Sequence, residues 1–506
     1  MGEAHPNQLG QSTWLGRDDT AQPGPPDAVE AATGLGLPTA AAQYGQAPTE
    51  ARRWTSQSGL GASGQTGLGD RTTPPAQTDQ PEPTSAEASH TYRFAAGNLG
   101  NLLRAPHYAV SLARSAVSKR DPMLWGVGSA FGVADGALAF ARAARDLEPS
   151  PRVVWLAADD AEAAAAAGAG FDAVVKDSRE GLRATRRAGL LAVTHGFGDV
   201  NRYGVTGALI VQLWHGEPLK KLHSDTSAIT GLGKLDRVPG AQAAMRWLYR
   251  KTTGQIGLFP VSSPVFAPFI RSAFDLDDQV RVLGEPRGDV LFAGPAAERR
   301  ERARAIFAER LGGLDAQRVF LYAPTWRDGR PDPGVPSAQE WQLIDEVCGY
   351  LDAVMVVRPH PLGVGSYSGF GPRVRLLGPA EQVEAIPLLW GVDALVTDYS
   401  SILFDYVATR GPYVLFAPDL EEYKASRGLY LDYESLAPQG VCFDWTAVLN
   451  QLHDLYRDPK RLADAELFSH HLAGRFHTYC DGRSAERVAI TARMLLAKKF
   501  PKYFTV

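Results

Sequence analysis

Short apolar runs alternate with alanine-rich stretches of helical character over most of this chain. The alternation is typical of βαβ units, in which helices cover both faces of a parallel sheet. It predicts an α/β protein with two doubly wound domains in series and a ligand cleft between them. The expected strands are 123–128, 153–157, 173–175, 190–193, 209–213 and 256–261 in the first domain, and 319–322, 353–357, 394–396 and 413–416 in the second.

The first 90 residues have a different composition. They contain 10 Pro and 12 Gly but only eight residues of the types Val, Ile, Leu, Met and Phe. Because so few apolar side chains cannot offset the entropy lost on ordering, this segment is predicted to be a disordered tail. The remaining chain divides into a basic amphipathic segment at 91–120, the two domains at 121–275 and 276–498, the latter with closing helices, and a basic and aromatic tail at 499–506.

Charge and hydropathy limit where the protein acts. With 52 basic and 56 acidic residues, nucleic-acid binding is not expected. No run approaches the roughly 18 to 20 apolar residues of a membrane span, and the N-terminus lacks a signal segment, which predicts a cytoplasmic location. The basic residues at 91–120 favour peripheral contact with anionic lipid, and the alternative is a basic helix packed on its own domain. The residues from Arg493 onward repeat this composition.

Four expected strands end on chemically capable side chains. In open parallel sheets, ligands bind beyond the carboxyl ends of the strands. The four groups are Trp214, His215, Gly216, Glu217 and Pro218, followed by Lys220 and Lys221; Pro324 and Thr325; Arg358, Pro359 and His360; and Ser400 and Ser401. The sequence therefore predicts one ligand site built from these strand ends.

His215 is the candidate general base. The adjacent Gly216 allows a substrate to approach closely, and an imidazole with a pKa near ~6.5 is suited to accept a proton at neutral pH. Arg358 and His360 flank Pro359, so both side chains can reach one side of an extended segment and donate to a diphosphate.

The remaining candidates each have a structural alternative. Ser400 and Ser401 open a helix whose N–H groups would bind phosphate oxygens, or they serve as helix caps. Lys220 and Lys221 contact an anionic acceptor or are solvated surface lysines. The sequence contains no zinc spacing, Walker A loop or GxSxG elbow, so no metal site is expected and hydrolase and P-loop functions are not favoured.

Eight sequence blocks occur in a consistent order between about 121 and 495. They are WHGEPLKKL (214–222), SSPVFAPFIRSAF (262–274), GEPRGDVL (284–291), YAPTWRD (322–328), VRPHP (357–361), VTDYSSILFDY (396–406), LEEYKASRGLYLDY (420–433) and DGRSAERV (481–488). Together they resemble the CDP-glycerol glycerophosphotransferase family, whose members prime and polymerise teichoic acids. The resemblance implies a GT-B fold, in which two Rossmann-like domains face each other across a cleft, with the acceptor on the N-terminal domain and the nucleotide donor on the C-terminal one.

The resemblance also implies roles for individual residues. His215 and His360 match the two histidines thought to be essential in the family. The implied donor site consists of Trp214, Gly216, Glu217, Pro218, Arg287, Pro324, Thr325, Arg358, Pro359, Ser400, Ser401 and Asp405. Two departures leave the substrates open: Glu217 stands where relatives carry a small hydroxyl or neutral residue, and Gly288 replaces an asparagine.

The implied reaction moves glycerol phosphate, or a related polyol phosphate, from CDP-glycerol or CDP-ribitol to a hydroxyl of a polyol-phosphate or lipid-linked acceptor. CMP is released, no cofactor is required, and the product is a teichoic-acid-like or capsular polymer. One alternative is a GT-B glycosyltransferase that uses a nucleotide-diphosphate sugar, and another is a non-catalytic relative that binds an anionic polymer or membrane.

Overall fold

The computed structural model describes residues 115, 117–226, 241–327, 330–360, 363, 367–368 and 370–504. The predicted disordered tail at 1–90 and most of the basic segment at 91–120 lie outside these residues, as does Pro361. None of the described helices is both long enough and apolar enough to cross a lipid bilayer.

The first sheet has seven strands, paired in the order β3-β2-β1-β4-β5-β6-β7, and all of these pairs are parallel. Its strands are β1 (Asp121–Val127), β2 (Arg152–Ala157), β3 (Asp172–Val175), β4 (Ala188–Val193), β5 (Leu209–Gln212), β6 (Ile256–Val261) and β7 (Val280–Val282). All six expected strands form, and β7 is an addition. It follows the predicted domain boundary at 275/276 yet pairs with β6, so the first sheet extends further along the chain than the sequence indicated.

The second sheet has five parallel strands in the order β10-β9-β8-β11-β12. They are β8 (Arg318–Ala323), β9 (Ala353–Val357), β10 (Val374–Leu376), β11 (Ala394–Thr397) and β12 (Tyr413–Leu415). The sequence predicted all of them except β10. Like β7, β10 is three residues long with a central arginine, too short and too interrupted to give a strand pattern.

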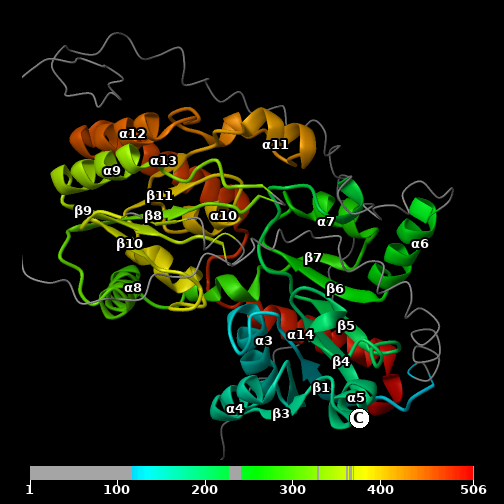
Figure 1. Ribbon diagram of the computed structural model, residues 1–506. Coiled ribbons are helices and arrows are strands. Elements are labelled where there is room, and N and C mark those ends of the chain that lie inside the picture. The colour runs from blue at the N-terminus through cyan, green and yellow to red at the C-terminus, as the bar shows by residue number, and fades with distance from the viewer. Residues whose placement is uncertain are drawn as a thin grey trace, which may run out of the picture. The chain divides into compact units, whose positions relative to one another are not determined.

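Helices cover both sheets (Figure 1). The α-helices are α3 (Asp135–Arg145), α4 (Asp160–Gly168), α5 (Arg179–Arg187), α6 (Ala241–Thr253), α7 (Ala267–Phe274), α8 (Ala296–Arg310), α9 (Ala338–Tyr350), α10 (Ile402–Val407), α11 (Leu420–Ser426), α12 (Trp445–Arg457), α13 (Pro459–Phe476) and α14 (Ser484–Lys499). The 3-10 helices are η3 (Phe197–Asp199), η4 (His223–Asp225), η7 (Pro286–Leu291), η9 (Ile386–Gly391), η10 (Glu434–Leu436) and η11 (Pro501–Tyr503).

Alternation along the strands assigns the two faces of the second sheet. Successive side chains of a strand point to opposite faces. In β8, Phe320 and Tyr322 pack with α9 and α12, whereas Val319 and Leu321 belong to the cluster that contains Phe307 of α8. Figure 1 shows α9 and α12 on one side of these strands and α8 on the other.

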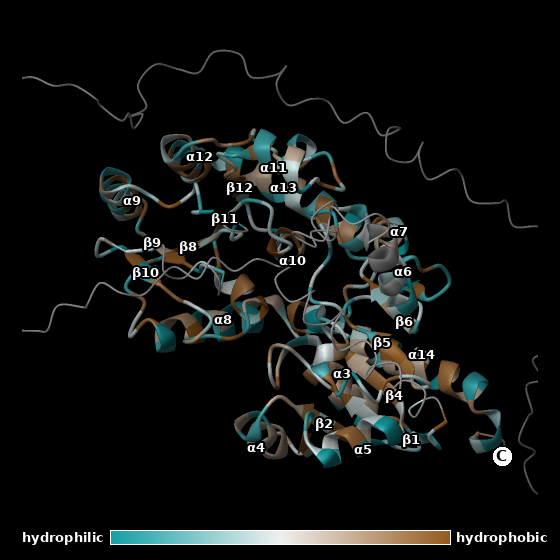
Figure 2. Cartoon of the chain, turned by 45° about the vertical axis from the view of Figure 1, so that its right-hand side comes forward, coloured by the Kyte–Doolittle hydropathy of each residue, from teal (hydrophilic) through white to brown (hydrophobic). Residues whose placement is uncertain are grey.

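Helix α14 packs on the first sheet although it follows the second sheet in the chain. Val488, Ala489, Ala492 and Leu496 are spaced to form one helix face, and they are buried in the cluster that contains Trp125 of β1. Figure 2 shows α14 in the brown of apolar residues where it lies beside β5. The sequence had grouped all closing helices with the second domain. Helical periodicity revealed the apolar face of α14 but not the surface that covers it.

Arg120, the last residue of the predicted basic segment, is buried. Its guanidinium donates to the carbonyl oxygens of Thr185, Ala188 and Gly204 at 2.7 to 2.8 Å and to the Ser115 hydroxyl at 2.9 Å. Burial, followed by the charge of Arg186, lowers the pKa of Arg120 to about 10. For this residue, the alternative interpretation of packing on its own domain is the one observed.

Replacing Arg120 should destabilise the first sheet. Arg120→Met leaves several buried carbonyl oxygens without donors, which should lower the free energy of unfolding by roughly 2 to 4 kcal/mol. Calorimetric melting of purified protein measures this loss. Arg183→Met, at an exposed position of α5, is the matched control and should melt like the wild type. Equal melting temperatures for the two variants would show that the Arg120 hydrogen bonds contribute nothing net.

Candidate active site

The loop that follows β5 meets the start of α10. Trp214 has a φ of 60° and Gly216 a φ of 132°, so the loop turns sharply on either side of His215. A Cβ atom at Gly216 would lie 2.7 Å from the Ser401 hydroxyl and 2.9 Å from Arg287 Nη1. Only glycine permits this approach, which brings together residues more than 180 positions apart in the chain. The close approach expected at Gly216 is therefore present in the fold.

His215 lies in an aromatic cluster at the carboxyl edge of the first sheet. Its ring stacks on that of His195, with 4.0 Å between centroids and 3° between planes, and Phe131 meets both rings edge-on. The Nδ1 atom of His215 lies 3.4 Å from the Thr194 carbonyl oxygen. A proton on Nδ1 satisfies that carbonyl and leaves Nε2 able to accept a proton.

Sequence reasoning missed His195. His195 lies in the loop after β4. The Asp199 carboxylate holds this loop by accepting hydrogen bonds from the backbone N–H groups of Thr194 at 2.8 Å and His195 at 2.7 Å. The Thr194 hydroxyl lies 3.1 Å from His195 Nδ1. The signal was available, because β4 ends on Thr194, His195 and Gly196 just as β5 ends on Trp214, His215 and Gly216.

Burial and the neighbouring His195 keep the His215 ring in its neutral form. Desolvation by the surrounding protein, then the neighbouring His195 and the Arg287 guanidinium, lower the pKa of His215 well below its ordinary value. Desolvation also lowers the pKa of His195. At neutral pH the His215 ring is therefore uncharged, with Nε2 free of a proton, which is the form required of a general base.

Arg287 forms a buried ion-pair cluster. Its Nη1 lies 3.0 Å from one carboxylate oxygen of Asp405 and 3.2 Å from the other, and its Nε lies 3.4 Å from Asp135. Arg287 and Asp405, both predicted to bind the nucleotide donor, thus form an ion pair with each other. A donor that contacts either residue therefore meets a side chain that is already paired. Their roles in donor binding stay a prediction.

Glu217 is held by the backbone at the end of β6. Its carboxylate is buried and accepts a hydrogen bond from the backbone N–H of Ser262. Burial raises the pKa of Glu217 to about 7 and that of the nearby Glu285 well above its ordinary value. The negative charge that the sequence placed beside an anionic substrate is therefore reduced at neutral pH. The following Pro218 is buried in the same loop.

The strand ends of the second sheet supply Thr325 and His360. The backbone N–H of Thr325 donates to Asp398 at 2.9 Å, and its buried hydroxyl has no hydrogen-bond partner among the described residues. The rings of His360 and Trp326 are 5.8 Å apart. Desolvation and the charge of Lys220 lower the pKa of His360 to about 4. Pro324 and Pro359, which precede Thr325 and His360, are buried and shape their loops.

Arg358 is not placed with His360 as the sequence suggested. Its guanidinium donates to the carbonyl oxygens of Leu377 at 3.3 Å and Val383 at 3.0 Å. The side chain is buried, so these N–H groups hold the backbone after β10 instead of lying open beside the His360 ring. Arg358 and His360 would reach the same side only if the segment around Pro359 were regularly extended. Its role in donor binding stays a prediction.

The serines at the start of α10 differ from each other. The Ser400 hydroxyl accepts weakly from the backbone N–H of Ile402 at 3.4 Å, which is a cap-like contact, whereas Ser401 makes no side-chain cap and faces Gly216. The capping interpretation is thus observed for Ser400 alone, and phosphate binding by the two serines stays a prediction.

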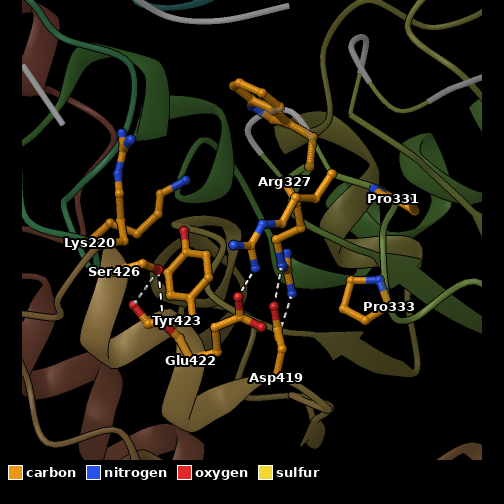
Figure 3. A pocket seen from close by; sticks show the side chains of 11 residues that line it. Lys220, Arg327, Pro331, Pro333, Asp419, Glu422, Tyr423 and Ser426 are labelled. Carbon is orange, nitrogen blue, oxygen red and sulfur yellow. Dashed lines mark hydrogen bonds and ion pairs between the residues drawn. The ribbon is translucent and has the colours of Figure 1, made fainter. Parts of the chain in front are cut away.

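Lys220 and Lys221 lie where the two halves of the chain are joined by backbone hydrogen bonds. The Lys221 N–H donates to the Gly428 carbonyl at 3.1 Å, and the Tyr430 N–H donates to the Leu219 carbonyl at 2.9 Å. Lys221 lies over Gly428, where a Cβ atom would be 2.8 Å from its Cδ. Lys220 instead lines a pocket with residues of α11 and of the loop after β8 (Figure 3).

Comparison with known proteins agrees with this geometry. Residues 107–492 match the family described as CDP-Glycerol:Poly(glycerophosphate) glycerophosphotransferase. The chain belongs to this family. The predicted relationship is thereby confirmed, and so is the transferase class that it carries.

Relatives and solved structures extend the comparison. A teichoic acid glycerol-phosphate transferase of Staphylococcus aureus is 27% identical over 56% of this chain and 70% of its own length. A teichoic acid ribitol-phosphate primase of Bacillus spizizenii is 28% identical over 45% of this chain, which spans 57% of that primase. The wall teichoic acid polymerase TagF has a TM-score of 0.62 at 20% identity, over 80% of this chain and 98% of TagF. The shared fold confirms the GT-B prediction.

For this glycerophosphotransferase-family protein, the pKa of His215 predicts a pH profile. A general base is inactive when protonated, so activity falls as the pH drops through its pKa. Because that pKa lies well below 6.5, kcat/KM should show no acid limb above about pH 6.5 and should decline only at lower pH. The rate of nucleotide release measured across this range tests the assignment. An acid limb centred above pH 6.5 would contradict it.

Proposed function

We propose that this protein transfers glycerol phosphate from CDP-glycerol to a hydroxyl group of an anionic polyol-phosphate acceptor and releases CMP. The observation that carries the proposal is the neutral His215, held by its ring stack on His195 beside Gly216 and Ser401. Membership of the glycerophosphotransferase family supports the donor class. A TagF structure obtained after soaking with CDPG, and a ribitol-phosphate primase among the relatives, support a CDP-polyol and leave glycerol as the first choice.

In the proposed reaction His215 acts as the general base. The acceptor hydroxyl loses its proton to Nε2 of His215 while its oxygen forms a bond to the β-phosphorus of the donor. The bond from that phosphorus to the bridging oxygen breaks, and the bridging oxygen departs with CMP. Catalysis of phosphoryl transfer of this kind depends mainly on positioning and on stabilising charge.

Donor binding is proposed for the strand-end residues around this base. The Ser401 hydroxyl lies beside Gly216, and the buried Thr325 hydroxyl has no hydrogen-bond partner among the described residues, so both can donate to the diphosphate. Neutral His360 still donates one hydrogen bond, and a bound diphosphate would raise its pKa and favour its charged form.

We also infer that the protein associates peripherally with anionic membrane lipid through α5. Arg179, Arg183 and Arg187 are spaced four residues apart along this helix and are exposed, and Arg186 and Lys119 line the same hollow. We call these five residues the α5 basic surface. Each basic residue near an anionic leaflet contributes about 1 kcal/mol. A lipid-linked acceptor would be presented at such a leaflet.

The reaction is tested by CMP release from CDP-glycerol or CDP-ribitol, with and without a glycerol-phosphate-terminated acceptor and beside a UDP-sugar. Acceptor-dependent CMP release from CDP-glycerol is expected. His215→Asn and His360→Asn should each reduce kcat about 10²- to 10⁴-fold, because each removes a group acting on the reacting atoms. His471→Asn, an exposed histidine of α13, is the matched control. Consumption of the UDP-sugar with neither CDP-polyol used would assign sugar transfer instead.

Membrane association is tested by sedimentation with vesicles of phosphatidylglycerol and phosphatidylcholine. Arg183→Gln combined with Arg187→Gln should weaken binding roughly 30-fold, the equivalent of two charges at about 1 kcal/mol each. Added salt should release the wild type, since it screens the attraction. The control double variant Arg302→Gln with Arg310→Gln, on α8, should bind normally. Equal binding of both double variants would exclude the α5 basic surface as the contact.

A further inference from the structure

A pocket of about 340 Å³ lies beside the reaction centre (Figure 3). Three parts of the chain line it: the segment after β5 contributes Lys220, the loop after β8 contributes Trp326 and Arg327, and α11 with its C-terminal end contributes Tyr423 and Arg427. Ser400 and Ser401, where the donor diphosphate is expected, are not among its lining residues. The pocket is therefore separate from the expected position of the donor phosphates.

Arg327 lines this pocket, and two carboxylates neutralise its charge. It contacts Asp398 at 2.8 Å and Asp419 at 2.7 Å, and its guanidinium lies over the rings of Tyr399 and Tyr423. Arg330, at the rim, is paired with Glu422. These arginines are neutralised by the acidic residues around them, so they hold the pocket in shape and leave little charge for a ligand.

Lys220 and Arg427 carry the charge that is not neutralised. Among the described residues, no carboxylate forms an ion pair with either of them, and the buried Nε of Arg427 has no hydrogen-bond partner. Desolvation and then the positive charge of Arg427 lower the pKa of Lys220 to about 8. Two neighbouring cations that repel each other in a partly buried pocket are stabilised by an anion bound between them.

The pocket adjoins both essential histidines of the proposed mechanism. Trp326 forms one wall and lies 5.8 Å from the ring of His360, while Lys220 is five residues after His215 in the same loop. The positive charge of Lys220 acts on both His215 and His360, so a ligand bound to Lys220 lies near both histidines. An acceptor built of polyol phosphates carries one negative charge per repeat, so its nearest phosphodiester lies a short distance from the reactive hydroxyl.

We propose that Lys220, Arg427 and Trp326 form an acceptor subsite that binds a phosphodiester group of the acceptor chain and holds its terminal hydroxyl at His215. The two cations bind the phosphodiester oxygens, and the indole packs on the polyol carbons. This inference rests on the proposed function. It implies that acceptors already carrying a phosphodiester are preferred to those that offer a hydroxyl alone.

Steady-state kinetics with a glycerol-phosphate oligomer test the subsite. Lys220→Gln and Arg427→Gln should each raise the KM for the oligomer about 10- to 100-fold and leave the KM for CDP-glycerol within twofold. Lys424→Gln is the matched control, because it removes a charge from the same helix at a residue paired with Glu434 outside the pocket. Arg427→Lys should recover part of the affinity. An increase confined to the KM for CDP-glycerol would reassign the pocket to the donor, and unchanged constants would overturn the proposal.

A binding measurement separates this inference from the proposed reaction. Calorimetric titration with glycerophosphoglycerol, without any donor, should show binding to the wild type and to Lys424→Gln and at least tenfold weaker binding to Lys220→Gln and Arg427→Gln. If the wild type released no CMP yet showed this pattern, the reaction would fail and the phosphodiester subsite would stand. If CMP were released but all proteins bound glycerophosphoglycerol equally, the subsite would be excluded and the reaction would stand.

Discussion

The buried cluster around Arg287 holds the reaction centre together. One guanidinium in the 3-10 helix η7 contacts Asp135 at the start of α3, beside the first sheet, and Asp405 in α10, beside the second. Helix α3 packs against η7 here, since a Cβ at Gly136 would lie in van der Waals contact with Arg287, 3.4 Å from its backbone nitrogen. Loss of the cation would leave buried carboxylates without compensation, at a cost of about 3 to 5 kcal/mol. The approach of Gly216 to Ser401 depends on this cluster.

A second connection fixes the other side of the same loop. Leu219 and Lys221 form backbone hydrogen bonds with Tyr430 and Gly428, and the Tyr430 ring stacks on Phe269 of α7 with 4.6 Å between centroids. The Tyr430 hydroxyl contacts both Asp225 at 2.6 Å and the backbone N–H of Leu222. The loop that carries His215 is therefore held at Arg287 on one side and at Tyr430 on the other, which keeps the imidazole in a defined position.

The sequence predicted the parts of this arrangement that depend on local pattern. Ten apolar runs became ten strands, and the loop after β5 in the first sheet meets the start of α10, which follows β11 of the second. β7 and β10 were missed because a central arginine interrupts each of these three-residue strands, whereas the equally short β12 is wholly apolar. The directions of Arg358 and Glu217 were not foreseeable, since backbone groups far along the chain, at Val383 and Ser262, determine them. His195 was missed although its strand end carried the same signal as that of His215.

Charge is distributed unequally along the loop that carries the base. On the Gly216 side, Arg287 is surrounded by more carboxyl groups than it can neutralise, and burial raises the pKa values of Glu217 and Glu285 so that protons make up the difference. On the Lys220 side, cations exceed the carboxylates that pair with them in the described residues. Because the cations of the second side are in excess, an anionic chain entering this region is attracted to that side. The neutral His215 lies between the two, so the uncharged terminal hydroxyl is the part of the acceptor that reaches it.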